Sequence, residues 1–173
     1  MILRLPELTL RPWSIADVDA VARHANDRDI WINLRDRFPH PYTRADAEMW
    51  LTHATQYPES SFAIEVEGEA VGGLSLEPMR DVECITAEMG YWLGRPHWGR
   101  GIATAAVLAA TGHAFERLGL ERVEAGVFEW NTASQRVLIK AGYTFEGRLR
   151  RRIVKDQRIG DVLMYARIRD AVG

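Results

Sequence analysis

Apolar residues recur at helical intervals in the second half of the chain. Their positions follow a three- and four-residue spacing: Ile102, Ala106, Val107, Ala110, Ala114, Phe115 and Leu118. This period is typical of a helix with one apolar face. Gly119 comes directly after the run, and glycine is common just past a helix C-terminus. We therefore expect a long central helix that begins near residue 102 and ends near residue 118.

Cap residues and apolar spacing predict three shorter helices. Ser14 precedes a helix that runs to about Ala25, and Thr43 precedes one that runs to Ala54. A third helix is expected over 131–141, where Gly142 follows its last residue. The proline-containing segment 38–42 is predicted to be extended, because each proline fixes its own φ and restricts the residue before it.

Runs of β-branched and aromatic residues predict the strands. They cover seven segments: 3–11, 62–67, 70–76, 84–93, 122–128, 143–155 and 159–168. The order is a group of strands, then strand, helix, strand and helix, and finally a hairpin. This order predicts an α+β (mixed α/β) fold, with a largely antiparallel sheet that opens where a helix intervenes.

Composition and charge limit the classes to which this protein can belong. With 173 residues, 47% hydrophobic and 27% charged, the chain suits a single soluble domain over 1–173. A net charge of −2 predicts no nucleic-acid partner. No signal peptide or membrane-length apolar stretch is found, so we expect a cytoplasmic protein without a membrane partner. The single cysteine, Cys84, is predicted to be a buried strand residue in a reducing compartment.

The turn between the strand over 84–93 and the central helix is the first candidate site. Its sequence is Trp98-Gly99-Arg100-Gly101-Ile102-Ala103. Glycine lets a ligand approach the backbone, and the first amides of a helix attract anions, so this turn suits a pyrophosphate. A tight turn without any ligand is the alternative. The chain lacks the Gly-Lys-Ser/Thr of a triphosphate loop and the third glycine of a dinucleotide fold.

These residues resemble the GNAT superfamily of N-acetyltransferases, whose signature after the fourth strand is Gln/Arg-x-x-Gly-x-Gly/Ala. Gly101 and Ala103 match it, whereas Trp98 stands where the superfamily usually has Gln or Arg. Tryptophan there is similar to the Rim-type N-terminal acetyltransferases of ribosomal proteins. Other motifs spread this resemblance over nearly the whole chain: Leu10-Arg11-Pro12, Phe38-Pro39-His40-Pro41-Tyr42, Ala87-Glu88-Met89-Gly90-Tyr91-Trp92-Leu93, Asn131-x-x-Ser134 and Ala141-Gly142-Tyr143-x-x-Glu146-Gly147.

The resemblance implies a fold and a cofactor site. The fold is a seven-stranded, mostly antiparallel sheet that splays after the fourth strand, with flanking helices. Acetyl-CoA, the acetyl donor, would place its pantetheine arm in the opening, against backbone groups of Tyr91, Trp92 and Leu93. The pyrophosphate would lie on Trp98, Gly99, Arg100, Gly101, Ile102 and Ala103. An asparagine at the position of Asn131 bonds the arm in this family.

Two residues are candidates for the chemistry. Glu88, on the fourth predicted strand, could take the proton of an amine directly or through water. A strand glutamate that faces solvent or pairs with an arginine is the alternative. A residue near Ser134 approaches the cofactor sulfur in the resembled family, and we expect Ser134 to orient a proton or a water. Asn131 and Ser134 also suit the first turn of a helix without any catalytic role.

Other residues have more ordinary explanations beside a functional one. Tyr165 could donate a proton to the leaving thiol, but strand aromatics are usually core. Asp161 could meet a substrate ammonium or bond backbone near a turn. The basic group Arg148, Arg150, Arg151, Arg152 and Lys155 could contact an acidic substrate or be a solvated strand face, with 148, 150 and 152 on one side. Trp13, Trp31 and Trp50 could wall the substrate side or fill the core. The five histidines show no close pair and no cysteine partner at the spacing of metal ligands, so no metal is predicted.

The expected reaction is acetyl transfer to an amine, preferably the N-terminal α-amine of a protein or peptide. At pH 7 about a tenth of an α-amine with a pKa near 8 is neutral, against well under one part in a thousand of a lysine near 10.4. Acetylation of a small amine, such as a polyamine, amino acid or antibiotic, is the nearest alternative. A non-catalytic acyl-CoA sensor is a third. The sequence leaves the oligomeric state open, including a homodimer, and also whether 31–42 moves as a lid.

Overall fold

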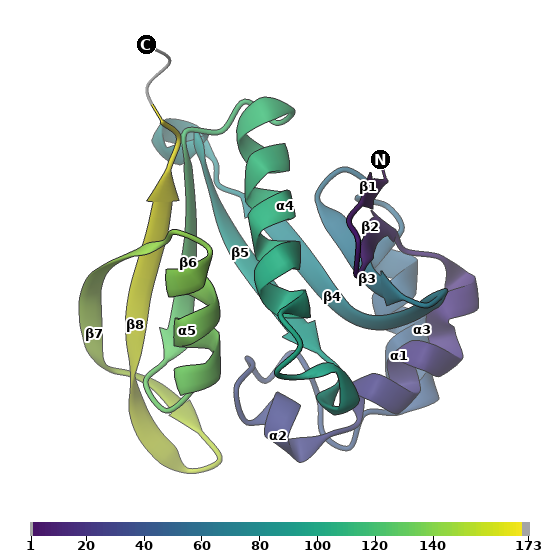
Figure 1. Ribbon diagram of the computed structural model, residues 1–173. Coiled ribbons are helices and arrows are strands. Elements are labelled where there is room, and N and C mark those ends of the chain that lie inside the picture. The colour runs from purple at the N-terminus through teal and green to yellow at the C-terminus, as the bar shows by residue number, and fades with distance from the viewer. Residues whose placement is uncertain (1, 171–173) are drawn as a thin grey trace. The chain divides into compact units, whose positions relative to one another are not determined.

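The computed structural model describes residues 2–170 and contains one mixed sheet with helices (Figure 1). The strands are β1 (Leu3–Arg4), β2 (Thr9–Pro12), β3 (Ser61–Val66), β4 (Glu69–Pro78), β5 (Thr86–Leu93), β6 (Arg122–Phe128), β7 (Thr144–Lys155) and β8 (Arg158–Ile168). The helices are α1 (Val18–Ala25), α2 (Arg28–Trp31), α3 (Arg44–Ala54), α4 (Ile102–Glu116) and α5 (Thr132–Lys140), with 3-10 turns η1 (Ile15–Asp17), η2 (Asp81–Glu83) and η3 (Arg95–His97). The strand order is β1-β2-β3-β4-β5-β6-β8-β7.

The described residues form two compact units, each of which has its own packing. Unit 1 lies within Met1–Ser75 and Tyr91–Ala106, and unit 2 within Leu76–Gly90 and Val107–Gly173. The expectation of one domain over 1–173 stays a prediction.

In unit 1 the prediction of a single first strand is wrong in one respect, because this segment forms two strands. Segment 3–11 forms β1 and β2, which pair antiparallel with Leu3 opposite Leu10. The backbone N–H of Leu5 donates to the carbonyl of Leu8 at 2.9 Å across the turn between them. Pro6 lies in this turn, where its fixed φ and missing N–H suit a chain reversal. The hairpin raises the strand number from the predicted seven to eight.

The helices of unit 1 begin where the cap residues predict. Thr43 and Asp46 form a reciprocal capping box at the start of α3, and Ser14 and Asp17 form one at η1, which leads into α1. These bonds satisfy amides that have no partner in the first helical turn. Helices α1 and α3 pack together around a core that includes Val21. The single turn α2 is not predicted, because four residues are too short to show a period.

In unit 2 a parallel pair leads into an antiparallel layer. β5 pairs parallel with β6 over Thr86–Glu88 and Arg122–Glu124. In the described structure the register stops there, so Met89 and Gly90 continue β5 without partners in β6. β6 then pairs antiparallel with β8, and β8 with β7. The end of pairing after Glu88 is what a sheet that splays at this strand requires.

Two expectations for unit 2 are wrong. Cys84 is not a buried strand residue, because β5 begins only at Thr86 and Cys84 is exposed in the turn after η2. The even alternation predicted for 148–153 is also broken. Arg151 has a φ of +50°, and the register between β7 and β8 shifts between Leu149 and Ile153. A bulge of this kind inserts residues into one strand and ends the simple two-residue repeat.

Candidate functional site

The glycine-rich turn enters α4 as the sequence predicts. Residues 98–101 form the turn, and α4 begins at Ile102. Gly99 and Gly101 have φ angles of +74° and +81°, which glycine adopts without steric cost. Apart from the flanking residues, no atom of residues 2–170 lies within 4 Å of where a Cβ would stand on either glycine. The space above both residues is therefore open to a ligand.

The backbone amides at the start of α4 are arranged as donors. The N–H of Ala105 donates to the carbonyl of Gly101 at 3.0 Å, which is the first turn of the helix. The amides of Ile102, Ala103 and Thr104 come before this bond, and such amides lack an acceptor inside the helix. Together with the partial positive charge of the helix end, they form a site that favours an anion.

Trp98 connects the turn to the end of β5. Its indole Nε1–H donates to the carbonyl of Leu93 at 2.6 Å, while its side chain stays 43% exposed. The N–H of Gly94 donates to the carbonyl of Val71 on β4 at 2.7 Å. A side chain on Gly72 would meet the carbonyl of Trp92 at 2.5 Å. The turn and the end of β5 are thus held to each other and to β4 by backbone acceptors.

Two histidines behind the turn form a contact that no sequence motif predicts. The rings of His24 (α1) and His97 (η3) meet edge to face with centroids 5.5 Å apart. Glu69 lies 2.6 Å from Nε2 of His24, and Arg23 also pairs with Glu69. Burial, with the nearby charges of His24 and Arg100, lowers the pKa of His97. The two histidines are 73 positions apart, so only the folded chain brings them together.

An open cavity of about 410 Å³ lies beside this cluster. Its lining residues come from α1, the segment that follows it, and η3: Arg23, His24, Asn26, Asp27, Arg95 and Pro96. Arg95 pairs with Asp29 at 2.5 Å, so its charge is already balanced. We assign no ligand to this cavity.

In unit 2 the face on which Glu88 lies can be derived from its neighbours. The hydroxyl of Tyr143 is 3.8 Å from the sulfur of Met89 and 2.7 Å from the hydroxyl of Thr111 on α4. Met89 therefore points to the face that α4 covers. Glu88 precedes it in the strand and points to the opposite face, together with its parallel partner Glu124.

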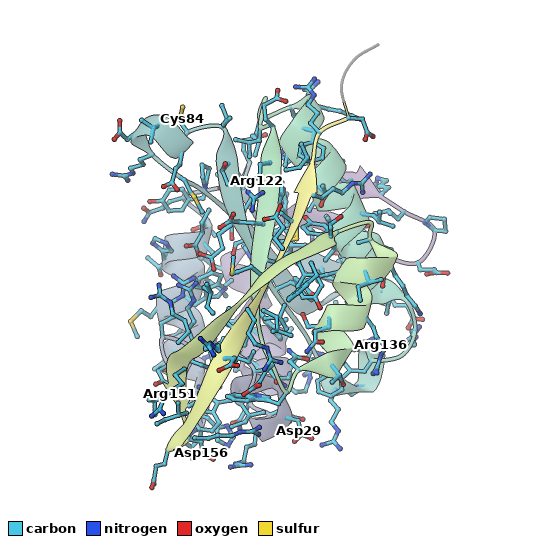
Figure 2. All side chains as sticks on the ribbon, turned by 90° about the vertical axis from the view of Figure 1, so that its left-hand side faces the viewer. Asp29, Cys84, Arg122, Arg136, Arg151 and Asp156 are labelled. Carbon is cyan, nitrogen blue, oxygen red and sulfur yellow. The ribbon has the colours of Figure 1, made fainter. Side chains whose placement is uncertain are left out.

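Arg122 binds two of the carboxylates near Glu88. It contacts Glu124 at 2.8 Å and both carboxylate oxygens of Glu146 at 2.6 and 2.9 Å (Figure 2 labels Arg122 on the sheet). This pairing raises the pKa of Arg122 and lowers that of Glu146. Glu88 itself is half-buried.

Asn131 and Ser134 are brought together at the start of α5. Asn131 is the N-cap, and its side-chain oxygen accepts the backbone N–H of Ser134 at 3.1 Å. The structural explanation for Asn131 is therefore confirmed. Its amide nitrogen does not take part in this bond and keeps its hydrogen-bond donors.

Tyr165 and Asp161 occupy structural positions. Tyr165 is 5% exposed, its ring meets that of Phe145 edge to face, and it pairs with Ala125. Ala125 follows Glu124 in β6, so Tyr165 lies on the face opposite to Glu88. Asp161 accepts the backbone N–H of Arg151 at 2.7 Å, which is the bond near a turn that the sequence suggested as its ordinary use.

The three tryptophans named as substrate-side candidates differ in burial. Trp13 is 5% exposed and belongs to the core of unit 1 with α1 and α3, as the ordinary explanation requires. Trp50 packs partly buried against the same core. Trp31 is half-buried, with its ring centroid 5.7 Å from that of His40.

The described residues lack two further features. Within residues 2–170 no group of three or more His, Cys, Asp or Glu side chains could hold a metal ion. In the same part of the chain, no helix has the length and hydropathy needed to cross a bilayer.

Comparison with known proteins identifies relatives over most of the chain. The family profile of the acetyltransferase (GNAT) domain matches residues 7–144. An uncharacterized N-acetyltransferase of Bacillus licheniformis, p20, is 32% identical over 162 residues, or 92% of this chain and 91% of p20. The ribosomal-protein-serine acetyltransferase of Escherichia coli (strain K12) is 34% identical over 113 residues, or 64% of this chain and 61% of that protein. The structure of Mycobacterium smegmatis RimJ in complex with CoA-disulfide superimposes with a TM-score of 0.85 at 28% identity, over 99% of this chain and 88% of RimJ.

These matches agree with the fold. The predicted GNAT-like, mostly antiparallel sheet with flanking helices is confirmed, apart from the additional strand, and so is the resemblance to Rim-type relatives. The chain belongs to the GNAT family of N-acetyltransferases.

Proposed function

We propose that the protein transfers an acetyl group from acetyl-CoA to a primary amine, preferably the N-terminal α-amine of a protein or peptide. The observation that carries this proposal is the open turn before α4, where two glycines with positive φ precede the first helix amides, which have no acceptor inside the helix. Such an arrangement suits a diphosphate, and the GNAT relative RimJ was solved with a CoA compound.

The residues at this turn fit the cofactor. The backbone of Trp98, Gly99, Arg100, Gly101, Ile102 and Ala103 would hold the pyrophosphate, and Arg100 adds an exposed cation. Backbone groups of Tyr91, Trp92 and Leu93 would pair with the pantetheine arm. The carbonyl of Leu93 already accepts one bond from Trp98, but a carbonyl has a second lone pair. Asn131 would add its amide N–H.

The chemistry requires a neutral amine and a route for its proton. Acetyl-CoA supplies the activated acetyl group as a thioester. We assign to Glu88 the role of accepting the amine's proton, directly or through water. Ser134, whose backbone is fixed by Asn131, would orient a proton or water near the leaving sulfur. No metal takes part in this scheme.

The preference for an α-amine has two supports. About a tenth of such an amine is neutral at pH 7, so one carboxylate such as Glu88 is a sufficient base. In addition, a relative that matches 64% of the chain is named a ribosomal-protein-serine acetyltransferase. A cytoplasmic location agrees with a substrate of this class.

Two measurements test the proposal. Calorimetric titration with CoA should give saturable heat, and incubation with acetyl-CoA and a panel of amines should release free thiol fastest with an N-terminal peptide. Faster release with polyamines, amino acids or aminoglycosides would assign a small-molecule acceptor instead. Saturable CoA binding without turnover of any amine would support a sensor and refute the enzyme mechanism.

A further inference from the structure

Strand β7 carries a bulge in its pairing with β8. Its register with β8 shifts between Leu149 and Ile153, and Arg151 in the middle has a φ of +50°. A residue with a side chain adopts this conformation only at a steric cost, so the surrounding structure must hold it. Bulges of this kind re-aim side chains, often beside active sites.

Asp161 of β8 is the residue that holds the bulge. One carboxylate oxygen accepts the backbone N–H of Arg151 at 2.7 Å, and the other accepts the guanidinium of Arg148 at 3.0 Å. The Asp161 side chain is only 15% exposed. Arg148 also reaches Glu129 at 3.5 Å. The bulge is therefore a fixed feature of the hairpin.

The arginines at the bulge differ from many others in the chain. The side chains of Arg150, Arg151 and Arg152 are exposed and form no ion pair or hydrogen bond with any residue in 2–170. Many other arginines do pair with a carboxylate: Arg11, Arg23, Arg44, Arg95, Arg122, Arg148 and Arg169. Three adjacent unpaired cations are notable in a chain whose net charge is −2.

The position of this bulge links it to Asn131, a candidate cofactor-binding residue of unit 2. Glu129, which Arg148 contacts, is two residues before Asn131, the cap of α5. β7 is also the last strand in the sheet order, so among residues 2–170 its outer edge has backbone groups without a neighbouring strand. Figure 2 shows Arg151 on the β7 and β8 hairpin.

We propose that Arg150, Arg151 and Arg152 form a docking surface for an acidic segment of the acceptor polypeptide. The acidic side chains would lie against the three guanidiniums, and the extended backbone would follow the outer edge of β7. This inference rests on the proposed function, because it names the class of polypeptide whose N-terminus is acetylated.

Nucleic acid is a less suitable occupant of this surface. Trp130, the nearby aromatic ring that could stack on a base, is covered by the guanidinium of Arg158 at 4.4 Å, and Gly160 packs against it. Three cations also neutralise few phosphates, whereas nucleic-acid sites depend on many. The free strand edge offers backbone pairing, which a polypeptide can use and a nucleic acid cannot.

The test compares two peptides that share their first four residues. In one peptide the next eight residues include five Asp or Glu, and in the other these are Asn or Gln. We expect the KM of the acidic peptide to be about tenfold lower at low salt, since several exposed ion pairs each contribute modestly. Because exposed charges are screened, the difference should shrink at 0.5 M NaCl.

Charge reversal assigns the preference to the bulge. The double variant R150E/R152E should equalise the two KM values and leave the KM for acetyl-CoA unchanged. The matched control is R80E/R117E, which changes the net charge equally at two other exposed arginines of unit 2 that form no ion pair within residues 2–170. It should retain the preference. Thermal melting of both variants confirms that they are folded.

Each outcome decides a different claim. Turnover of both peptides with equal KM in the wild type would refute the docking surface and leave the proposed function intact. Turnover of small amines but of neither peptide would refute the α-amine preference and the docking surface together. A short RNA that competes with the acidic peptide more tightly than that peptide binds, and loses this in R150E/R152E, would assign the surface to nucleic acid instead.

Discussion

Glu88 and Glu124 are in-register neighbours on the parallel strands β5 and β6, on the sheet face away from Thr111 of α4. Arg122 binds Glu124 and Glu146 on this face. One cation thus pairs with two carboxylates, and the carboxylate of Glu88 lies beside them. Arg122 gives Glu124 and Glu146 an ion pair each, directly beside the candidate base Glu88.

Replacement of Glu88 tests that role. E88Q keeps the size of the side chain and removes its basicity, so kcat should fall by about 10²- to 10⁴-fold. Calorimetry should show unchanged CoA affinity. The control is E83Q in the exposed turn η2 of the same unit, which should keep full activity. If E88Q retains wild-type kcat and the same pH profile, another group is the base.

The glycine turn allows a test with a matched pair of variants. Gly101 and Gly68 both have positive φ, +81° and +84°. Beyond the flanking residues, the described part of the chain has no atom within 4 Å of the place that a Cβ would occupy on either. G101A and G68A should therefore lose similar stability, on the order of 1 kcal/mol each. Only G101A should also weaken CoA binding, by about tenfold, because its strain shifts the amides that face the diphosphate. Equal CoA affinity in both variants would contradict the assigned site.

The indole of Trp98 should stabilise the turn through one hydrogen bond. W98F removes the N–H that reaches the carbonyl of Leu93, which should cost about 1 kcal/mol and raise the KM for acetyl-CoA. The control is W50F, since the buried Nε1 of Trp50 has no hydrogen-bond partner in the described structure. Its KM for acetyl-CoA should stay at the wild-type value. Equal KM values for wild type and W98F would show that the bond does not support the cofactor.

Tyr143 should make the free energy of unfolding fall as the pH rises through the alkaline range. Burial raises the pKa of Tyr143 to about 12 from an ordinary value of 10.0, so the folded state keeps a proton that the unfolded state loses. Its contribution is complete below pH 10 and is lost as the pH rises from 10 to 12. Urea unfolding across this range should show a smaller decline in Y143F than in the wild type. Y57F, which changes an exposed tyrosine, should follow the wild type.

Local signals in the sequence were sufficient for several elements. β6 lies at 122–128 as predicted, and α4 begins directly after the glycine turn. Asn131 caps α5, and β7 and β8 form the expected hairpin. Each of these depends on a cap, a glycine or a period within a few residues, so the chain alone specifies it.

The features that were missed depend on contacts between distant residues. Arg151 takes a positive φ although it is not glycine, because Asp161 binds its backbone. The contact between His24 and His97 exists only after α1 and η3 have folded in unit 1. Pro6 was the one local signal that could have revealed the β1 and β2 hairpin, since it interrupts an otherwise alternating run.

The bulge in β7 has an evolutionary consequence. Asp161 accepts a hydrogen bond from the main chain of Arg151. The guanidiniums of 150–152 form no ion pair or hydrogen bond within the described residues. On the proposed docking surface, mutations at these positions would alter which polypeptides are favoured while the scaffold and its chemistry persist. Related proteins would then differ in the polypeptides they prefer through exchanges of surface charge alone.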